Sequence, residues 1–242
     1  MKRWKKLVII CVSIIVACGI GCAIYISDYY HAQEEAMESV RVNDDEVKGI
    51  EIENKQIIFA PDNPKAGLIF YPGGKVEYTA YAPLMEAFAR EGILSIVVKM
   101  PGNLAVMDMN AAEGIKEQYL DIEKWYIGGH SLGGAMAASY VSDHTDEFEG
   151  LLLLAAYSTA DISNSELNVI SVYGSEDKVL KMDSYQKNRE NLPDDYVEEV
   201  IEGGCHAYFG YYGEQDGDGI PVITQEEQIR KTVEVFKESE GL

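Results

Sequence analysis

A glycine-rich stretch near the middle of the chain indicates the fold of the rest: Gly128-Gly129-His130-Ser131-Leu132-Gly133-Gly134. Residues 123–127 before it are typical of a strand, and residues 135–141 after it are typical of a helix. A Gly-x-Ser-x-Gly pattern between a strand and a helix predicts a sharp turn that presents the serine hydroxyl at a sheet edge. An ordinary glycine-rich turn without chemistry is the alternative, so the other parts of a catalytic site must be sought.

Strand and helix patterns alternate on both sides of this turn. Strand patterns occupy residues 47–52, 55–59, 66–71, 93–98, 151–155, 169–173 and 196–201, the first two forming a hairpin around Glu53-Asn54. Helical spacing occupies residues 81–90, 111–119, 182–191 and 225–239. Such alternation predicts an α/β fold with a mostly parallel sheet of about eight strands and helices on both faces.

The first residues predict a membrane segment. Four basic residues within positions 2–6 precede an uncharged run from Leu7 to Ile26. Twenty residues at 1.5 Å each span about 30 Å, the thickness of a hydrocarbon core. Basic residues on the N-terminal side place that end in the cytoplasm. We expect a single-pass anchor at residues 1–27, a polar stalk at 28–46, and a folded body at 47–242 on the outer side of the cell membrane.

Two other interpretations of the N-terminal segment stay open. One is a cleaved secretory signal, which is usually shorter than this run. The other is a lipoprotein signal, because Ile15-Val16-Ala17-Cys18 resembles a bacterial lipobox. Against it, residues 19–26 remain apolar, whereas polar residues usually follow a lipidated cysteine. All three interpretations place the body outside the cytoplasm.

Charge and cysteine content exclude several classes of function. The net charge is −21; without residues 1–28 it is −24, since 16 basic residues face 40 acidic ones. A surface so acidic repels nucleic acid and anionic lipid. Cys205 is the single cysteine after the apolar run, so no disulfide can form within the body, and no His/Cys cluster suggests a metal. We expect no cofactor, and the sequence does not determine the oligomeric state.

A serine nucleophile needs a base, and the base needs an orienting acid. In this architecture the chain order is Ser, acid, His, and the site lies beyond the carboxyl ends of the strands. Asp177 follows the strand at 169–173 through Gly174-Ser175-Glu176 and is the predicted acid. A turn carboxylate is the alternative role for such an aspartate. Glu176 is a weaker candidate, and Asp161 a weaker one still.

The base is chosen by elimination among four histidines. His31 lies beside the membrane segment, and His130 is turned away from the neighbouring serine by the turn itself. His144 closes the helix after the turn, where a helix C-terminus favours a cation. His206 follows the last predicted strand through Gly203-Gly204 and is therefore the predicted base.

The oxyanion formed on the substrate needs two backbone amides. The amide of Leu132, at the start of a helix, is the first. The second is expected in the loop after the strand at 66–71, where Gly74 is the first choice and Gly73 and Lys75 are its neighbours. An ordinary Pro-Gly turn is the alternative there.

Taken together, these segments resemble the alpha/beta-hydrolase superfamily, and more narrowly a compact bacterial branch near the dienelactone hydrolases, over residues 47–240. The resemblance rests on residues 71–75, 128–134, 174–179 and 203–219. It implies Ser131 as nucleophile, Asp177 as acid, His206 as base, and Leu132 with Gly74 as oxyanion donors. Dienelactone hydrolases use a cysteine nucleophile, so the serine at position 131 argues against a dienelactone as the substrate.

The predicted activity is that of a serine hydrolase, most simply a carboxylic-ester hydrolase that forms an acyl-enzyme with small soluble esters. An acyltransferase would use the same residues, and a non-catalytic binding module on the same scaffold is the other alternative. Residues 156–168 are too few for a lid of several helices, since one helix averages about 11–12 residues. We therefore expect no large cap and a preference for short acyl groups.

Overall fold

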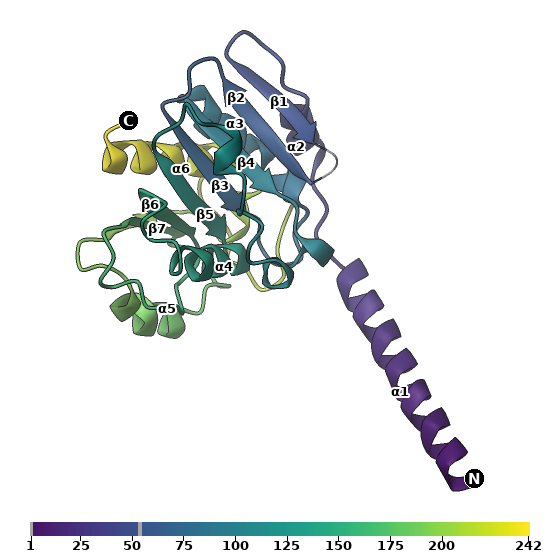
Figure 1. Cartoon of the computed structure of the whole chain (residues 1–242). Coiled ribbons are helices and arrows are strands. Elements are labelled where there is room, and N and C mark those ends of the chain that lie inside the picture. Colours follow the sequence, from purple (N-terminus) through teal and green to yellow (C-terminus); the bar gives the residue numbers. More distant parts are fainter. Residues whose placement is uncertain (1, 53–54) are drawn as a thin grey trace.

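Eight strands form one sheet in the order β1-β2-β4-β3-β5-β6-β7-β8 (Figure 1). The computed structural model describes residues 2–52 and 55–242, so the predicted turn at Glu53-Asn54 lies outside the described residues. The strands are β1 (Val47–Ile52), β2 (Gln56–Pro61), β3 (Ala66–Tyr71), β4 (Ile93–Val98), β5 (Trp125–His130), β6 (Gly150–Leu154), β7 (Asn168–Gly174) and β8 (Val197–Ile201). β2 pairs antiparallel with β1 and β4, and all other pairs are parallel. The α/β fold with a mostly parallel sheet is confirmed.

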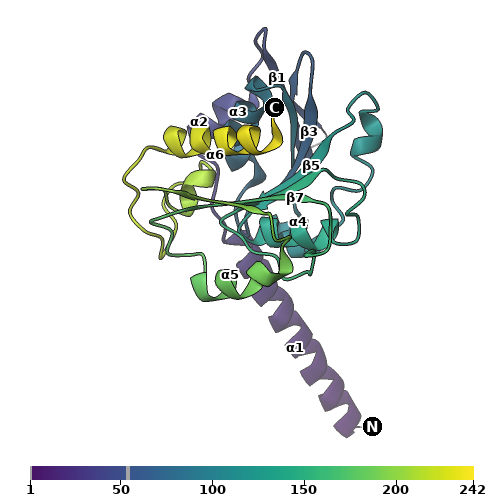
Figure 2. The same ribbon diagram turned by 90° about the vertical axis from the view of Figure 1, so that its left-hand side faces the viewer.

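Helices cover both faces of the sheet, because the central strands are apolar on both sides. The helices are α1 (Lys2–Ser27), α2 (Glu34–Val40), α3 (Ala82–Arg90), α4 (Leu132–Val141), α5 (Met182–Asn188) and α6 (Gln225–Glu240). α3 and α6 pack on one face, and α4 packs on the other (Figure 2). Within β3, Leu68 and Phe70 point into the core under α3 and α6, while Ile69 and Tyr71 point into the core under α4.

The helix predicted at residues 111–119 is wrong. The segment forms turns and one short 3-10 helix at Lys116–Gln118. Gly114 has a φ of 74°, which a right-handed helix cannot accommodate. The Tyr71 hydroxyl also holds the backbone, because it donates to the Met109 carbonyl at 2.7 Å and accepts from the Ala112 amide at 2.9 Å. A tertiary contact has replaced hydrogen bonds that a helix would need.

α1 projects away from the body, whereas the polar segment after it lies against the body (Figure 1). The Tyr30 amide donates to the Lys75 carbonyl at 2.7 Å, and Ala36 of α2 is fully buried. Residues 28–46, for which we expect a stalk, thus pack on the domain, because they carry small and aromatic side chains among the charged ones. Val8–Ser27 is a 20-residue stretch with a mean hydropathy of 2.7, long and apolar enough to cross a membrane, and none of it is buried.

The connection between β6 and β7, all of which the structure describes, contains no helix or strand. No large cap is therefore inserted at this position, as the length of residues 156–168 predicts.

Candidate active site

Ser131 occupies a strained turn between β5 and α4. Its φ and ψ are 52° and −120°, and its amide donates to the Leu154 carbonyl of β6 at 2.9 Å. A non-glycine residue in such a conformation costs about 1–3 kcal/mol and persists only where its surroundings hold it. The sharp strand-to-helix turn predicted from the sequence is present, with the serine at its apex.

Two glycines allow this turn to pack tightly. A Cβ on Gly129 would lie 2.5 Å from the Gly133 carbonyl carbon, and one on Gly133 would lie 2.2 Å from the Tyr71 carbonyl oxygen. Heavy atoms do not approach so closely, so any side chain at either position would push α4 away from β3 and β5. The glycines let the start of the helix rest on the end of β3.

Backbone strain gathers along the carboxyl edge of the sheet. Within residues 2–52 and 55–242, the non-glycine residues with positive φ are Lys75, Asn103, Ser131 and Ala155. They follow β3, β4, β5 and β6, which are neighbours in the sheet in the order β4, β3, β5, β6. Strain of this kind concentrates at functional sites, so the edge itself marks the candidate site.

Asp177 and His206 form a buried pair at this edge. The Asp177 Oδ2 lies 2.8 Å from the His206 Nδ1, and both side chains are 1% exposed. The other oxygen, Oδ1, accepts from the amides of Val179 and Leu180 at 2.8 Å each. These bonds hold the carboxylate rigidly, so the imidazole is oriented with Nε2 directed away from the acid.

The rival candidates lie elsewhere. The Asp161 carboxylate is exposed and accepts from the amide and hydroxyl of Ser163. The Glu176 carboxylate contacts only the hydroxyl of Ser175, at 3.4 Å. His31 faces Glu77 at 3.4 Å, and His144 bonds the Tyr140 carbonyl at the end of α4. None of these groups contacts His206 within the part of the chain that the structure describes.

Ser131 and His206 line the same cavity, whose volume is about 430 Å³. The remaining lining is largely apolar and comes from α4 and the segments after β6 and β7: Leu132, Ala135, Met136, Ala155, Ala156, Tyr157, Thr159, Val179, Leu180 and Lys181. The His206 Nε2 is buried and has no hydrogen-bond partner among the described residues. This nitrogen is the one polar atom of the His206 ring without a partner among the described residues.

One amide of the loop after β3 is free to meet an oxyanion. The Gly73 amide donates to the Tyr81 hydroxyl at 3.0 Å, and the Lys75 amide donates to the Asn103 carbonyl at 2.7 Å. The Gly74 amide has no acceptor among the described residues, and a Cβ on Gly74 would lie 2.9 Å from the Leu132 Cδ2. Gly74 therefore lies beside Leu132, the first residue of α4; that the two amides bind an oxyanion stays a prediction.

His130 has a role that sequence reasoning missed. It is 1% exposed, and its Nδ1 lies 2.7 Å from the Tyr81 hydroxyl that also accepts from Gly73. Burial lowers the pKa of His130 well below its usual value, and the nearby His206 lowers it further. A neutral His130 thus joins the serine turn to the oxyanion loop through Tyr81. Tyr81 and His130 are 49 positions apart in the sequence, so no local sequence pattern predicts the contact between them.

Asp218 joins the two loops that carry Asp177 and His206. Its carboxylate accepts from the amides of His206 at 3.3 Å, Ala207 at 2.9 Å and Lys178 at 3.3 Å. The segment 217–219 contributes to the family resemblance, but its contacts are set by the tertiary structure. The signal in the sequence was an aspartate between two glycines.

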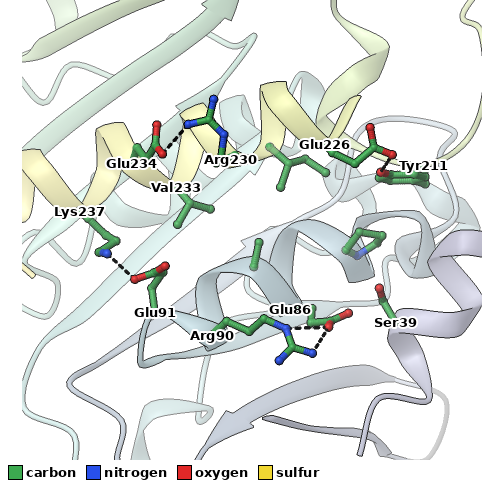
Figure 3. A pocket seen from close by; sticks show the side chains of 13 residues that line it. Ser39, Glu86, Arg90, Glu91, Tyr211, Glu226, Arg230, Val233, Glu234 and Lys237 are labelled. Atoms are coloured by element: carbon green, nitrogen blue, oxygen red, sulfur yellow. Dashed lines mark hydrogen bonds and ion pairs between the residues drawn. The ribbon is translucent and has the colours of Figure 1, made fainter. Parts of the chain in front are cut away.

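A larger cavity, of about 490 Å³, lies between α3 and α6 (Figure 3). Ion pairs surround it: Arg230 with Glu234 and Arg90 with Glu86, each at 2.6 Å, and Lys237 with Glu91. Its lining includes none of the predicted site residues. Within residues 2–52 and 55–242 no group of three or more His, Cys, Asp or Glu is placed to hold a metal ion.

Comparison with known proteins agrees with this fold. Residues 67–230 match the family model described as the alpha/beta hydrolase family. One similar solved structure is a protein described as a predicted CIB-like hydrolase from Thermoplasma acidophilum, with 16% identity, a TM-score of 0.57, and a match that covers 80% of this chain and 98% of that chain. A second is TT1662 from Thermus thermophilus, with 14% identity, a TM-score of 0.59, and coverage of 80% of this chain and 98% of that chain. A third is Est1E from Butyrivibrio proteoclasticus, with 12% identity, a TM-score of 0.57, and coverage of 81% of this chain and 100% of that chain. At such identities the likeness shows the fold alone. No curated protein sequence matches the chain.

Proposed function

Because the chain belongs to the alpha/beta hydrolase family, we propose that it is a serine hydrolase that cleaves carboxylic esters through an acyl-enzyme. One observation carries the proposal. The His206 imidazole is bonded at Nδ1 to Asp177, its Nε2 has no partner among the described residues, and His206 lines the same cavity as the strained Ser131. The esterase-like name of one structural neighbour, Est1E, is consistent with it.

The proposed reaction has two halves. The Ser131 hydroxyl attacks the ester carbonyl, while the His206 Nε2 accepts the hydroxyl proton. The amides of Leu132 and Gly74 donate to the oxyanion that forms. His206 then returns the proton to the departing alcohol, which leaves an acyl group on Ser131. Water, deprotonated by His206, attacks this acyl group, and the carboxylic acid and the free serine are regenerated.

The electrostatics of the pair support this cycle. The proton that His206 accepts makes its ring positive, and the buried Asp177 carboxylate stabilises that charge at 2.8 Å. Asp177 keeps its own bonds to Val179 and Leu180 throughout, so it need not move. The neutral His130, whose ring centroid lies 4.5 Å from that of His206, places no second positive charge beside it.

We also infer that α1 anchors the protein in the cell membrane, with its N-terminus in the cytoplasm and the catalytic body outside. The apolar stretch Val8–Ser27 supports the anchor, and the four basic residues within positions 2–6 support a cytoplasmic N-terminus. Membranes washed at alkaline pH should retain the chain, and intact-mass analysis should recover residues 1–28. A mature N-terminus at a lipidated Cys18 would favour the lipoprotein interpretation instead.

A fluorophosphonate probe tests the catalytic proposal, because it reacts only with an activated serine. The parent should be labelled at Ser131 and should hydrolyse p-nitrophenyl butyrate. Ser131→Ala should abolish labelling and lower the rate by about 10⁴-fold or more, while its circular dichroism spectrum stays that of the parent. Ser158→Ala, a buried serine outside the cavity, is the matched control and should remain labelled. A parent that neither reacts nor hydrolyses the ester would be a binding module.

A further inference from the structure

Only a very short segment connects the end of α1 to the body. α1 ends at Ser27, and the Tyr30 backbone already pairs with the body through the Lys75 carbonyl at 2.7 Å and the Glu77 amide at 2.9 Å. Three extended residues span at most about 11 Å. If α1 spans the bilayer, the point of attachment therefore lies within or just beyond the headgroup layer.

That point belongs to the catalytic edge of the sheet. Lys75 follows Gly74 directly, its ammonium group contacts Asp28 at 2.7 Å, and its amide bonds Asn103. A Cβ on Gly102 would lie 3.0 Å from the Ile26 Cγ2, so the segment after β4 touches the last turn of α1. Figures 1 and 2 show α1 leaving the body on the side where α4 lies. The edge that carries Ser131 is thus the edge nearest the membrane.

Exposed apolar side chains continue from this contact. Val106, Met107 and Met109 follow Gly102-Asn103 by three to six residues and are 56%, 55% and 42% exposed. We call these three residues the apolar rim. An apolar rim that follows a contact with a membrane helix is typical of a surface that contacts lipid. Exposure of apolar side chains to water is unfavourable, and insertion among lipids removes that exposure.

The same edge carries other groups suited to an interface. Ile220 and Val222 are 85% and 80% exposed, and the Val222 amide bonds the Gly203 carbonyl just after the end of β8. Near α1, the Lys75 ammonium lies 4.7 Å above the Tyr25 ring, and tyrosines are enriched where a membrane meets water. The net charge of −24 outside residues 1–28 leaves no general attraction to anionic lipid, so the contact must be apolar.

We propose that the catalytic edge lies on the outer surface of the bilayer, with the apolar rim inserted among the headgroups, and that the enzyme takes esters held at that surface. The substrate class is a short-chain acyl ester of a membrane-resident alcohol. Hydrolysis with one water molecule leaves the alcohol in the membrane and releases the short acid. This inference rests on the proposed function in two respects, α1 as anchor and Ser131 as nucleophile.

Depth of insertion tests the surface without requiring activity. The full chain is reconstituted in phosphatidylcholine vesicles, and Val106→Trp is compared with Leu120→Trp. Leu120 is 87% exposed but precedes β5, at the opposite edge of the sheet. Trp4 and Trp125 form a background common to both variants. Lipids brominated near the headgroup should quench the added fluorescence of Val106→Trp and leave that of Leu120→Trp unchanged. Equal quenching in protein that floats with the vesicles would overturn the proposal, and so would protein that does not float.

Hydrolysis tests the substrate class. Hexadecyl butyrate in the vesicles is compared with soluble p-nitrophenyl butyrate, using Val106→Asp combined with Met107→Asp, and Leu120→Asp as control. The rim variant should lose about tenfold in rate on the vesicle ester, which corresponds to about 1.4 kcal/mol of docking free energy, and keep the parent rate on the soluble ester. Equal rates of rim variant and control on the vesicle ester would overturn the proposal. A parent inactive on both esters would refute the ester function alone, since the quenching result stands without it.

Discussion

At the residue scale, the buried Asp177–His206 pair supplies the acid and the base of the proposed reaction. Three hydrogen bonds fix the carboxylate, two from backbone amides and one from the imidazole. The carboxylate then determines which ring nitrogen faces the cavity. An aspartate in a surface turn, such as Asp161, has comparable bonds but no imidazole. Position relative to His206, and not residue type, therefore separates the two.

Asp177→Asn should lower kcat for p-nitrophenyl butyrate by about 10³–10⁴-fold, because the amide neither stabilises the imidazolium nor holds the required tautomer. Asp161→Asn should change the rate by no more than about twofold, as an exposed substitution usually does. Steady-state kinetics of both variants provide the measurement. Equal, small losses would show that Asp177 is not the acid.

His130 should make stability fall on acidification. Burial lowers the pKa of His130 in the folded chain, whereas the unfolded chain takes up a proton near the ordinary value of 6.5. Below that pH the unfolded state binds more protons, so the free energy of unfolding falls by up to about 1.4 kcal/mol per pH unit. The advantage of the parent over His130→Asn, measured by urea unfolding, should be larger at pH 7.5 than at pH 5.5.

Tyr81→Phe is the matched control for that experiment, because it removes the hydroxyl partner at 2.7 Å and keeps the imidazole. It should lose stability at both pH values while retaining the pH dependence of the parent. Parallel pH profiles for the parent and His130→Asn would contradict the assignment.

At the element scale, the site depends on how α4 rests on the end of β3. The close approach at Gly133 brings the Leu132 amide beside Gly74, while Tyr81 and Asn103 occupy the two flanking amides of the loop. The Asp218 carboxylate likewise holds together the loops of Asp177 and His206, because it accepts from the amides of Lys178 and His206. The proposed catalytic groups thus come from separate elements, and specific contacts with backbone amides or carbonyls join these elements.

Gly133→Ala should separate α4 from β3, since the new methyl group would lie 2.3 Å from the Pro72 carbonyl oxygen. We expect a loss of about 1–3 kcal/mol in the free energy of unfolding, as for other overpacked sites, together with a fall in kcat. Ser139→Ala, in the same helix, removes only a bond to the Ala135 carbonyl and should cost less than half as much. Calorimetry and ester kinetics on both variants decide the matter; an unchanged kcat would show that the contact does not position the oxyanion donors.

At the scale of the whole molecule, the absence of a cap between β6 and β7 limits what the cavity can enclose. The lining comes from the body itself, and under the proposed function the acyl and alcohol parts of an ester must share the cavity of about 430 Å³. Each methylene left in water forgoes about 0.8 kcal/mol. Long acyl chains therefore gain little from the site.

A C4 p-nitrophenyl ester should accordingly be a better substrate than a C12 ester, judged by kcat/KM on the body without residues 1–28. Its rate should saturate smoothly across the micellar threshold, because no described segment is placed to open as a lid. A C12 preference, or a sharp rise at the threshold, would mean that part of the scaffold moves to uncover the serine.

The sequence by itself determined the fold class and the turn around Ser131. Both depend on local information: continuous apolar runs make buried strands, and a serine between glycines at a strand-to-helix junction permits one backbone path. Chain order then directed the choice of Asp177 and His206, because the carboxyl ends of parallel strands meet at one edge. The structure brings these two side chains together at 2.8 Å.

Only the tertiary structure decided that the amide of Gly74, and not that of Gly73 or Lys75, is free, since the partners Tyr81 and Asn103 come from other segments. Residues 111–119 failed to form the predicted helix for the same reason, because Tyr71, about forty positions away, holds their backbone. The packing of residues 28–46 likewise depends on distant partners, since the Tyr30 backbone pairs with that of Lys75 and Glu77. Long-range hydrogen bonds and close contacts have energies comparable to local preferences, so no pattern along the chain reveals which of them prevails.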